Sequence, residues 1–475
     1  MKKRCSAAEG NPTNPTNPTP VHTEPIATAH TDAPLIVLVQ PWIHDFAAYD
    51  VWAHPLGLLL LAGILRRHGY RVRFIDCLDR FHPEEAPADP KARCGRGPYR
   101  KAPLPRPRGL EDVPRRFCRY GIRPNWLQAE LKATPVPDLV LVTSMMTYWW
   151  TGVAETIAAV RRVWPEVPVV LGGVYATLCR EHAEANCGAD RVVPGQGERK
   201  VLEAAAEMTG FSSPPRFDFE DLDALPYPAL DLKRTLASVP LLTSQGCPFR
   251  CAYCASRLLQ PRRRLRSPAS VVEEVRYWHR DRKVEDFALY DDAFLVNAAD
   301  HALPLLERLA AERLPVRFHT PNALHIQKMD RQTARLLHRA GFHTIRLGLE
   351  TDRSTSRRDL DEKVSEGQFE SAVRHLKAAG FDGNQIGVYL LAGLPDQQER
   401  EIVDAIRRVR DCGVSPILAH YSPVPGTTLW QKAVASSRYD LDADPVFTNN
   451  AVWPCRKEPF SWSLWSRLKA LAAKR

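Results

Sequence analysis

The 475-residue sequence has no apolar run long enough to cross a membrane. A membrane-spanning helix needs about 20 mostly apolar residues, and the longest apolar stretch, Leu56–Leu65, is much shorter. Basic residues open the chain but no apolar segment follows them, so we do not expect secretion. The eleven cysteines therefore indicate free thiols in a reducing compartment. We expect a cytoplasmic protein without a membrane partner.

A fourth cysteine is missing from the one place where cysteines cluster. Cys247, Cys251 and Cys254 follow a short apolar stretch, Val239–Thr243, with the spacing Cys-x3-Cys-x2-Cys. A structural zinc site needs four ligands, and no further Cys or His lies nearby to complete one. Three thiolates can instead hold an iron–sulfur cluster, which normally has four cysteine ligands. One iron would remain open to a substrate or cofactor, which indicates redox catalysis rather than electron transfer through a closed cluster.

Strand-like and helix-like stretches alternate from residue 34 to residue 210. The predicted strands are Leu35–Val39, Arg71–Ile75, Leu139–Thr143, Val167–Leu171 and Arg191–Val193. This alternation predicts an α/β unit with a doubly wound, flavodoxin-like parallel sheet, which binds ligands beyond the carboxyl ends of its strands. A Pro-rich, basic insertion interrupts the unit over residues 80–135. Residues 1–33 repeat Asn-Pro-Thr and contain few apolar side chains, so we expect a disordered tail.

A second alternating series begins near residue 237, after a Pro-rich, acidic linker over residues 211–236. Its predicted strands are Val239–Thr243, Glu285–Tyr290, Val316–Thr320, His343–Leu349, Gln385–Leu391 and Pro416–His420. Six such units predict a partial (β/α)6 barrel over residues 237–434, with its chemistry on the loops at the strand carboxyl ends. The three cysteines follow the first strand and so lie on that face. Residues 435–475 contain three tryptophans and are interpreted as a packing extension.

The cysteine run, with Tyr253 before its last cysteine, resembles the signature of the radical SAM superfamily. The resemblance implies that Cys247, Cys251 and Cys254 bind a [4Fe–4S] cluster whose open iron binds the amino and carboxyl groups of S-adenosylmethionine. One electron from the cluster then cleaves S-adenosylmethionine to methionine and a 5′-deoxyadenosyl radical. The resemblance therefore also implies an electron donor such as flavodoxin or ferredoxin.

Polar residues at the predicted strand ends resemble the S-adenosylmethionine contacts of this superfamily. Asp291 and Asp292 end the second strand, where a carboxylate would meet the methionyl ammonium group; capping the next helix is an equal alternative. Glu350 ends the fourth strand and matches a position that reaches the ribose hydroxyls or the amino group. The resemblance also assigns Tyr253, Asn322, Tyr389 and Gly393 to S-adenosylmethionine, with a plain strand core as an equal alternative for Tyr389.

The N-terminal unit resembles a cobalamin-binding domain. Small residues after its strands would let the backbone approach a corrin ring and its nucleotide tail. The resemblance assigns these positions to cobalamin: Ser144, Met145, Met146, Gly172, Gly173, Tyr175, Gly195, Gln196, Gly197 and Glu198. The usual Asp-x-His-x-x-Gly pattern is absent, since His44 and Asp45 stand in the wrong order, so no histidine is predicted to bind cobalt from below. A domain that has lost its cofactor is the alternative.

Together these resemblances imply a radical SAM enzyme, and the leading hypothesis is one that uses cobalamin to methylate an unactivated carbon or phosphorus of a small molecule. A radical cyclisation or rearrangement without methyl transfer is the second hypothesis. A third is an RNA-modifying enzyme that uses the basic insertion, which has thirteen Lys and Arg against six Asp and Glu. A solvated insertion explains that charge more simply, and a methylthiotransferase would need a second cysteine triplet, whereas Cys77, Cys94 and Cys118 are scattered. We therefore do not expect a nucleic-acid partner, and no pattern identifies the substrate or the catalytic residues.

Overall fold

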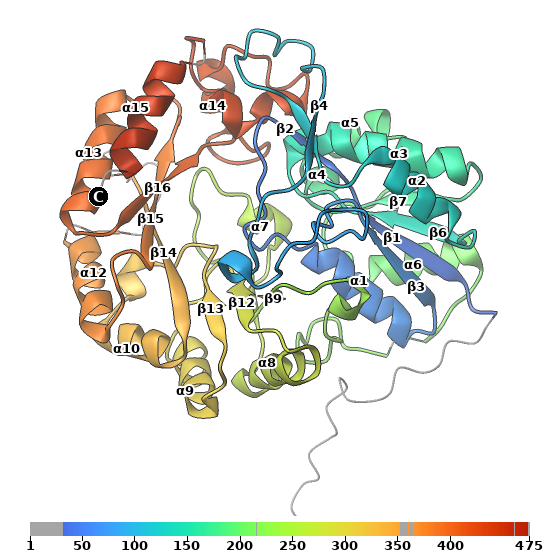
Figure 1. Cartoon of the computed structure of the whole chain (residues 1–475), viewed down its shortest axis with the longest axis horizontal. Coiled ribbons are helices and arrows are strands. Elements are labelled where there is room, and N and C mark those ends of the chain that lie inside the picture. Colours follow the sequence, from blue (N-terminus) through green and yellow to red (C-terminus); the bar gives the residue numbers. More distant parts are fainter. Residues whose placement is uncertain are drawn as a thin grey trace, which may run out of the picture.

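A five-stranded parallel sheet forms the N-terminal unit of the computed structural model (Figure 1). In the order β3-β1-β6-β7-β8, its strands are Arg71–Asp76, Leu35–Gln40, Leu139–Val142, Val169–Leu171 and Arg191–Val192. Counted along the chain this is the order 2-1-3-4-5 of flavodoxin-like sheets, which confirms the predicted fold. The structure describes residues 32–214, 216–351, 360, 364–365, 367–459 and 461–473, so most of the predicted disordered tail lies outside the described residues.

Helices cover both faces of this sheet, because the strand side chains that point to either face are apolar. In β1, Val37 and Val39 pack into one core cluster, whereas Ile36 and Leu38 pack into another. The first face lies under α2 (Pro124–Lys132), α3 (Trp150–Val163) and α5 (Arg180–Asn186). The second lies under α1 (Leu56–Arg67) and α6 (Lys200–Thr209), and the short α4 (Val174–Leu178) follows β7.

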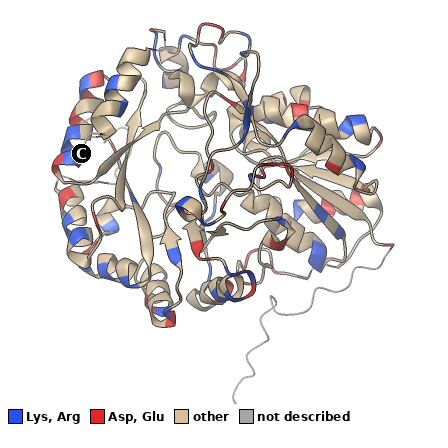
Figure 2. Cartoon of the chain, viewed as in Figure 1, with Lys and Arg blue, Asp and Glu red and all other residues tan. Residues whose placement is uncertain are grey.

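Six parallel strands in the order β16-β15-β14-β13-β12-β9 form the second unit, as the sequence predicted. They are β9 (Val239–Leu241), β12 (Asp286–Leu289), β13 (Arg317–His319), β14 (Phe342–Glu350), β15 (Ile386–Ala392) and β16 (Ser415–His420). The outer helices are α8 (Pro268–Arg282), α9 (Ala302–Glu312), α10 (Arg331–Arg339), α12 (Gln368–Ala379) and α13 (Glu399–Asp411). One large apolar core joins these helices to the strands. Basic and acidic residues are interspersed over the outer helices (Figure 2).

The basic insertion folds against the rest of the chain instead of extending into solvent. Its strands β4 (Lys101–Pro103) and β5 (Cys118–Tyr120) pair with β2 (Ile43–Asp45) in an antiparallel sheet, and η2 (Ala92–Gly95) precedes them. Four of its five aromatic side chains, Tyr99, Phe117, Tyr120 and Trp126, are buried, and Phe81 is half-buried. These rings therefore form no exposed surface on which nucleic-acid bases could stack. Many of its arginines are paired, as in Arg80–Asp50 and Arg119–Glu155.

The C-terminal segment bridges the two units at the top of Figure 1. It comprises α14 (Trp430–Ser436), η6 (Pro445–Thr448), η7 (Asn450–Val452) and α15 (Trp462–Ala473). Val446 and Ala451 pack against Leu110 and Phe117 of the insertion. On the other side, the rings of Trp453 and Trp465 contact His420 of β16. Among the described residues no helix combines the length and apolar composition of a membrane span.

Candidate active site

The cysteine run lies in a loop at the carboxyl end of β9, held between two short strands, β10 (Ser244–Gln245) and β11 (Arg264–Leu265). Gly246 begins the loop with φ of 77°, and a Cβ there would lie 2.5 Å from the Arg262 carbonyl oxygen. Only glycine fits this turn without strain. Cys247 is half-buried, Cys251 is buried and Cys254 is exposed, and all ten described cysteines are free thiols.

Contacts from three segments hold the cysteine loop in place. The Ala252 N–H donates to the Leu360 carbonyl at 2.8 Å, and the Leu429 N–H donates to the Ala252 carbonyl at 2.9 Å. The Phe249 ring stacks on His325 with centroids 4.7 Å apart. The Ser256 N–H points at the Cys254 sulfur at 3.4 Å, and such donors stabilise a thiolate that ligates iron. Contacts with the rest of the protein thus position this loop.

The two adjacent aspartates after β12 have different surroundings. Asp291 accepts hydrogen bonds from the Thr243 hydroxyl and the Ser244 hydroxyl, both at 2.6 Å, and from the Thr243 N–H at 3.1 Å. It therefore ties β12 to the strand that leads into the cysteine loop, while burial raises its pKa. Asp292 instead lines a cavity. Neither aspartate caps a helix, because α9 begins at Ala302 with His301 at its N-cap.

Three predicted residues lie on neighbouring strands: Asn322 follows β13, Glu350 ends β14 and Tyr389 lies within β15. The Asn322 amide donates to the Tyr290 carbonyl at 2.9 Å, and the Tyr389 hydroxyl donates to the Pro321 carbonyl at 2.8 Å. Glu350 ends β14 with φ of 64°, next to a shift in the β14–β15 register. A positive φ is uncommon for a non-glycine residue and is found often at functional sites. A Cβ on Gly348 would come within 2.8 Å of the Glu350 carboxylate, so this glycine makes room for it.

Gly393 follows β15 in a turn that the sequence did not fully explain. Its φ is 91°, and the N–H groups of Gly393 and Leu394 both donate to the Gln397 side-chain oxygen, at 2.8 and 3.2 Å. The Gln397 amide in turn donates to the Leu391 carbonyl at 2.9 Å. Gln397 thus shapes this strand end. No local pattern singled it out, because a glutamine that hydrogen-bonds a turn has no fixed spacing.

A cavity of about 480 Å³ lies between the two units, at the carboxyl ends of both sets of strands. Residues after β6, β7 and β8 and the start of α1 form one wall. The other wall is formed by Leu242, Ser244, Gln245, Tyr290 and Asp292 of the barrel unit, together with α7 (Ser256–Leu259) and Gln260. The Gln196 amide donates to the Gln260 side-chain oxygen across the two walls at 2.6 Å.

Backbone and small side chains shape the N-terminal wall. The Ser144 hydroxyl donates to the Gly172 carbonyl at 2.7 Å, and the Val174 N–H donates to the Ser144 carbonyl at 2.8 Å. A Cβ on Gly173, whose φ is 95°, would lie 2.3 Å from the Ser144 carbonyl oxygen. A Cβ on Gly172 would meet nothing closer than the Val193 carbonyl oxygen at 3.7 Å. Gly173 is therefore needed for the fold, while Gly172 leaves open space.

The structure separates the residues that the sequence assigned to cobalamin into two groups. Eight of them line the cavity: Ser144, Met145, Gly172, Gly173, Gly195, Gln196, Gly197 and Glu198. Met146 and Tyr175 are not in its wall; Tyr175 is fully buried on the other side of the loop, with its hydroxyl 2.6 Å from His182 Nδ1. Apart from His54, the sequence analysis assigned no role to the part of the wall at the start of α1, which is formed by Pro55, Leu56, Gly57, Leu58, Leu60 and Leu61. The signal that could have identified these residues is their position at the start of a helix that packs on the sheet.

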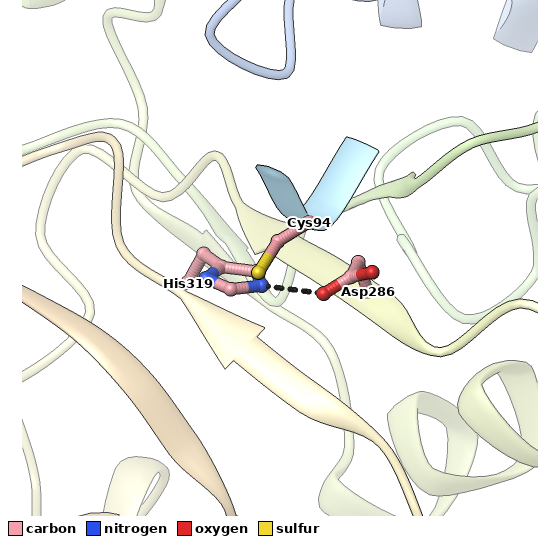
Figure 3. Close-up of side chains that lie close together, drawn as sticks. All are labelled: Cys94, Asp286 and His319. Carbon is pink, nitrogen blue, oxygen red and sulfur yellow. Dashed lines mark hydrogen bonds and ion pairs between the residues drawn. The ribbon is translucent and has the colours of Figure 1, made fainter. Parts of the chain in front are cut away.

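A second group of metal-binding residue types lies inside the barrel. Cys94 of the insertion stands beside Asp286 and His319 of two neighbouring strands (Figure 3). Asp286 is already engaged, because Arg317 donates to both its oxygens at 2.8 and 2.7 Å and His319 Nε2 lies 2.9 Å away. A metal ion would have to displace the guanidinium from that carboxylate. The group is therefore a closed polar network rather than a ready metal site.

Comparisons with known proteins agree with this geometry. Residues 241–409 match the family model of the Radical SAM superfamily, and residues 127–205 match that of the B12 binding domain. An uncharacterized methyltransferase of Pyrococcus horikoshii is 26% identical over 63% of this chain and 70% of its own. The cytidylyl-2-hydroxyethylphosphonate methyltransferase of Streptomyces wedmorensis is 23% identical over 72% of this chain and 69% of its own.

A solved structure shares the fold. It is the radical S-adenosylmethionine methyltransferase TsrM from Kitasatospora setae, with cobalamin and a [4Fe–4S] cluster bound. The TM-score is 0.62 at 19% identity, and the likeness covers 85% of this chain and 75% of that one.

Proposed function

We propose that this chain, a radical SAM protein with a B12-binding domain, is a cobalamin-dependent methyltransferase that modifies an unactivated carbon or phosphorus of a small molecule. One observation carries the proposal: residues after the strands of both units line the same cavity, so the two cofactor sites adjoin. The names of the two curated relatives support methyl transfer. When bound, the cluster would supply the electron that cleaves S-adenosylmethionine, and cobalamin would carry the methyl group.

The residues present fit these cofactors. We assign Cys247, Cys251 and Cys254 to the cluster, because their loop is fixed by hydrogen bonds and carries an N–H donor to Cys254. For S-adenosylmethionine, Asp292 and Glu350 are the carboxylates at the strand ends. Asn322, Tyr389 and Gly393 shape the backbone beside them, and Tyr253 stays in the proposed site from its place in the cysteine run.

The wall around Gly172 fits a corrin ring. The described lining is mostly apolar, with leucines of α1 facing small residues after β6 and β7. The space left open at Gly172 allows a large ring to approach the backbone. We assign the cavity-lining set to cobalamin and leave Met146 and Tyr175 out of direct contact.

We further propose that no protein imidazole binds cobalt. His44 is turned away, with Nε2 2.8 Å from Glu155 and Nδ1 3.1 Å from Thr151. Of the described residues in the cavity wall, His54 is the only histidine. Its Nε2 lies 2.9 Å from the Ser238 hydroxyl, and burial lowers its pKa well below the usual value. His54 is therefore the residue whose removal tests the claim.

The test is anaerobic reconstitution of the full chain with iron, sulfide and hydroxocobalamin. We expect absorbance from both the cluster and the corrin, and 5′-deoxyadenosine on adding S-adenosylmethionine and a reductant. Methyl transfer to a substrate also yields S-adenosylhomocysteine, whereas radical cyclisation or rearrangement does not. Absence of bound corrin would remove the methyltransferase proposal. Nitrogen hyperfine coupling that vanishes in His54→Ala would contradict only the claim about the imidazole.

We also infer that a flavodoxin or ferredoxin delivers the electron. A cluster in an open loop needs a protein or small reductant that reaches it, and Cys254 is the exposed cysteine of the three. Replacing the chemical reductant by flavodoxin with its reductase should support S-adenosylmethionine cleavage. Cleavage that occurs only with the chemical reductant would contradict this partner.

A further inference from the structure

The cysteine loop leaves and rejoins the barrel unit through one short antiparallel strand pair. β10 enters the loop and β11 leaves it, with Gln245 paired to Arg264. Between the two strands lie the three cysteines, α7 and a returning segment that ends in three consecutive arginines, Arg262, Arg263 and Arg264. The position of the whole loop therefore depends on the contacts that hold its base and its returning segment.

The three arginines have different partners. Arg262 is exposed, and its guanidinium lies 3.4 Å from the Glu220 carboxylate. Arg263 donates to the Gly246 carbonyl at 3.1 Å and to two further carbonyls after β12. Arg263 thus holds the loop to the barrel unit itself. The third arginine reaches toward the N-terminal unit.

The Arg264 guanidinium connects the base of the cysteine loop with the N-terminal wall. Its two terminal nitrogens donate to the Gln245 side-chain oxygen and to the Phe219 carbonyl of the linker, each at 2.5 Å. It also forms an ion pair with Glu198 at 3.9 Å, and the two side chains are only 11% and 12% exposed. Gln245 and Glu198 line the cavity from opposite walls. Because burial reduces the screening of such a pair, Arg264 holds the two walls together.

A second contact joins the same two parts of the molecule. The Gln196 amide donates to the Gln260 side-chain oxygen at 2.6 Å. Gln260 directly follows α7, where its N–H donates to the Ser256 carbonyl at 2.7 Å. On the other side, the Gly195 N–H donates to the Thr177 hydroxyl at 2.9 Å, which fixes the loop that carries Gln196. The base of the cysteine loop and the end of α7 are thus both attached to the loop after β8.

We propose that Arg264 and Gln260 are positioning residues, which hold the cysteine loop against the N-terminal wall and so set the distance between the iron–sulfur cluster and the corrin. This inference rests on the proposed function and adds two residues that act through the loop. Two separate contacts restrain rotation of the loop as well as its separation from the wall. Reactions between bound groups are sensitive to displacements of about 1 Å. Gln196 and Glu198 then have a second task beside lining the cavity.

The first experiment needs neither cofactor. Amide hydrogen exchange is measured on the full chain without iron, in peptides that cover residues 246–263, where the N–H groups of Ala252, Leu259 and Gln260 are hydrogen-bonded. Arg264→Gln should accelerate exchange about ten- to hundredfold, the factor expected for loss of a charge-assisted hydrogen bond. Gln260→Ala should accelerate it about three- to tenfold, as for a neutral hydrogen bond. Unchanged exchange in both variants would overturn the proposal.

Two matched variants show whether the effect is specific. Arg262→Gln removes a charge from the same returning segment, but an exposed pair contributes little, so exchange should remain as in the wild type. Arg264→Lys keeps the charge toward Glu198 and loses the planar fork, so it should recover part of the protection. Equal acceleration in Arg262→Gln and Arg264→Gln would show a nonspecific effect of charge and overturn the proposal.

The second experiment measures the position of the loop directly. Pulsed electron paramagnetic resonance on the full reconstituted chain reports the magnetic interaction between the reduced cluster and cob(II)alamin. The wild type should give one narrow distance distribution. Arg264→Gln and Gln260→Ala should retain iron and corrin but broaden this distribution, whereas Arg262→Gln should not. A distribution that stays unchanged when both substitutions are combined would contradict the positioning role.

Two outcomes separate this proposal from the proposed function. A wild type that binds the cluster but no corrin would remove the proposed function, while faster exchange in Arg264→Gln would still keep the attachment of the loop to the wall. Should Arg264→Gln not fold, because it leaves the Glu198 carboxylate buried without this partner, the half-buried Gln260 decides both experiments through Gln260→Ala.

Discussion

The two units contribute different kinds of groups to the candidate site: mainly backbone and glycine from the N-terminal unit, and mainly polar side chains from the barrel unit. The N-terminal wall is shaped by backbone and by glycines, with Gly173 pressed against the Ser144 backbone and Gly172 facing open space. The barrel unit supplies side chains that act on a ligand: Asp292 lines the cavity, whereas the three cysteines lie in the adjoining loop and Glu350 at the end of β14, outside the cavity lining. Adding atoms should therefore damage the N-terminal wall, whereas removing atoms should damage the contribution of the barrel unit.

The largest expected difference between the two units is in the response to cysteine substitutions. Cys247→Ala, Cys251→Ala and Cys254→Ala should each abolish S-adenosylmethionine cleavage, because a cluster with two protein ligands is not held. Cobalamin binding should persist in all three, since none of the described cysteines lines the N-terminal wall. Iron content, corrin absorbance and 5′-deoxyadenosine release measure the three effects.

Cys412→Ala is the control for the cysteine series. Cys412 is a half-buried residue that ends α13, far along the chain from the loop. It should retain full iron content and cleavage. Full cleavage by the triple Ala variant of the loop would end the assignment of the cluster to these residues.

The N-terminal wall gives the second test, in which two adjacent glycines should behave differently. Gly172→Phe should weaken cobalamin binding about 100-fold or more with little change in melting temperature, because the ring enters open space that the ligand needs. Gly173→Ala should lower the melting temperature instead, since its Cβ would lie 2.3 Å from the Ser144 carbonyl oxygen at a positive φ. Equal effects of both changes on stability and binding would contradict the distinction.

Local patterns predicted the features that depend on neighbouring residues. Strand and helix periodicity gave both parallel sheets, and cysteine spacing located the loop after β9. The roles of two adjacent residues were harder to predict. Asp291 and Asp292 are alike in sequence, yet Asp291 accepts hydrogen bonds from Thr243 and Ser244 whereas Asp292 lines the cavity. Which of two neighbours faces inward depends on the twist and register of the strand end, which the sequence does not state.

Contacts between distant segments could not be predicted. The insertion was expected to be solvated, but Trp126 and Leu127 are buried under α3 and Cys94 reaches the barrel interior (Figure 3). Trp52 and His319, whose rings stack, are 267 positions apart in numbering. Short apolar pieces between prolines carry no periodicity, so only the folded chain shows where they pack.

Glu350 tests the contribution of the barrel unit, with a smaller expected effect. Glu350→Ala should weaken S-adenosylmethionine binding about ten- to hundredfold, as removal of a hydrogen bond to a charged group costs roughly 1.5–3 kcal/mol. Iron content should not change. Glu350→Gly should lose the same affinity while keeping or raising the melting temperature, because glycine adopts the φ of 64° without strain.

A control on an outer helix accompanies the Glu350 variants. Glu370→Ala removes a carboxylate of α12 that pairs with Arg408 at 2.8 Å, away from the strand ends. S-adenosylmethionine affinity should be unaffected by it. An affinity that is unchanged in Glu350→Ala as well would make Glu350 a purely structural carboxylate.

The walls should also differ in their response to acid, with the smallest effect of the series. His301 Nε2 lies 2.9 Å from the Thr243 hydroxyl, which donates to Asp291, so this histidine supports the strand end that leads to the cysteine loop. Burial lowers the pKa of His301 from 6.5 to about 4. Between these two pH values the unfolded chain binds a proton that the folded chain does not, so stability falls as pH falls. The loss is about 2 kcal/mol at pH 5 relative to pH 7 for this one group.

His301→Gln should reduce the fall in melting temperature over that range, whereas the exposed His338→Gln should not. The Ser144–Gly172–Gly173 contacts contain no titratable group, so cobalamin should remain bound at a pH where the cluster begins to be lost. Loss of both cofactors in parallel would contradict the difference between the walls.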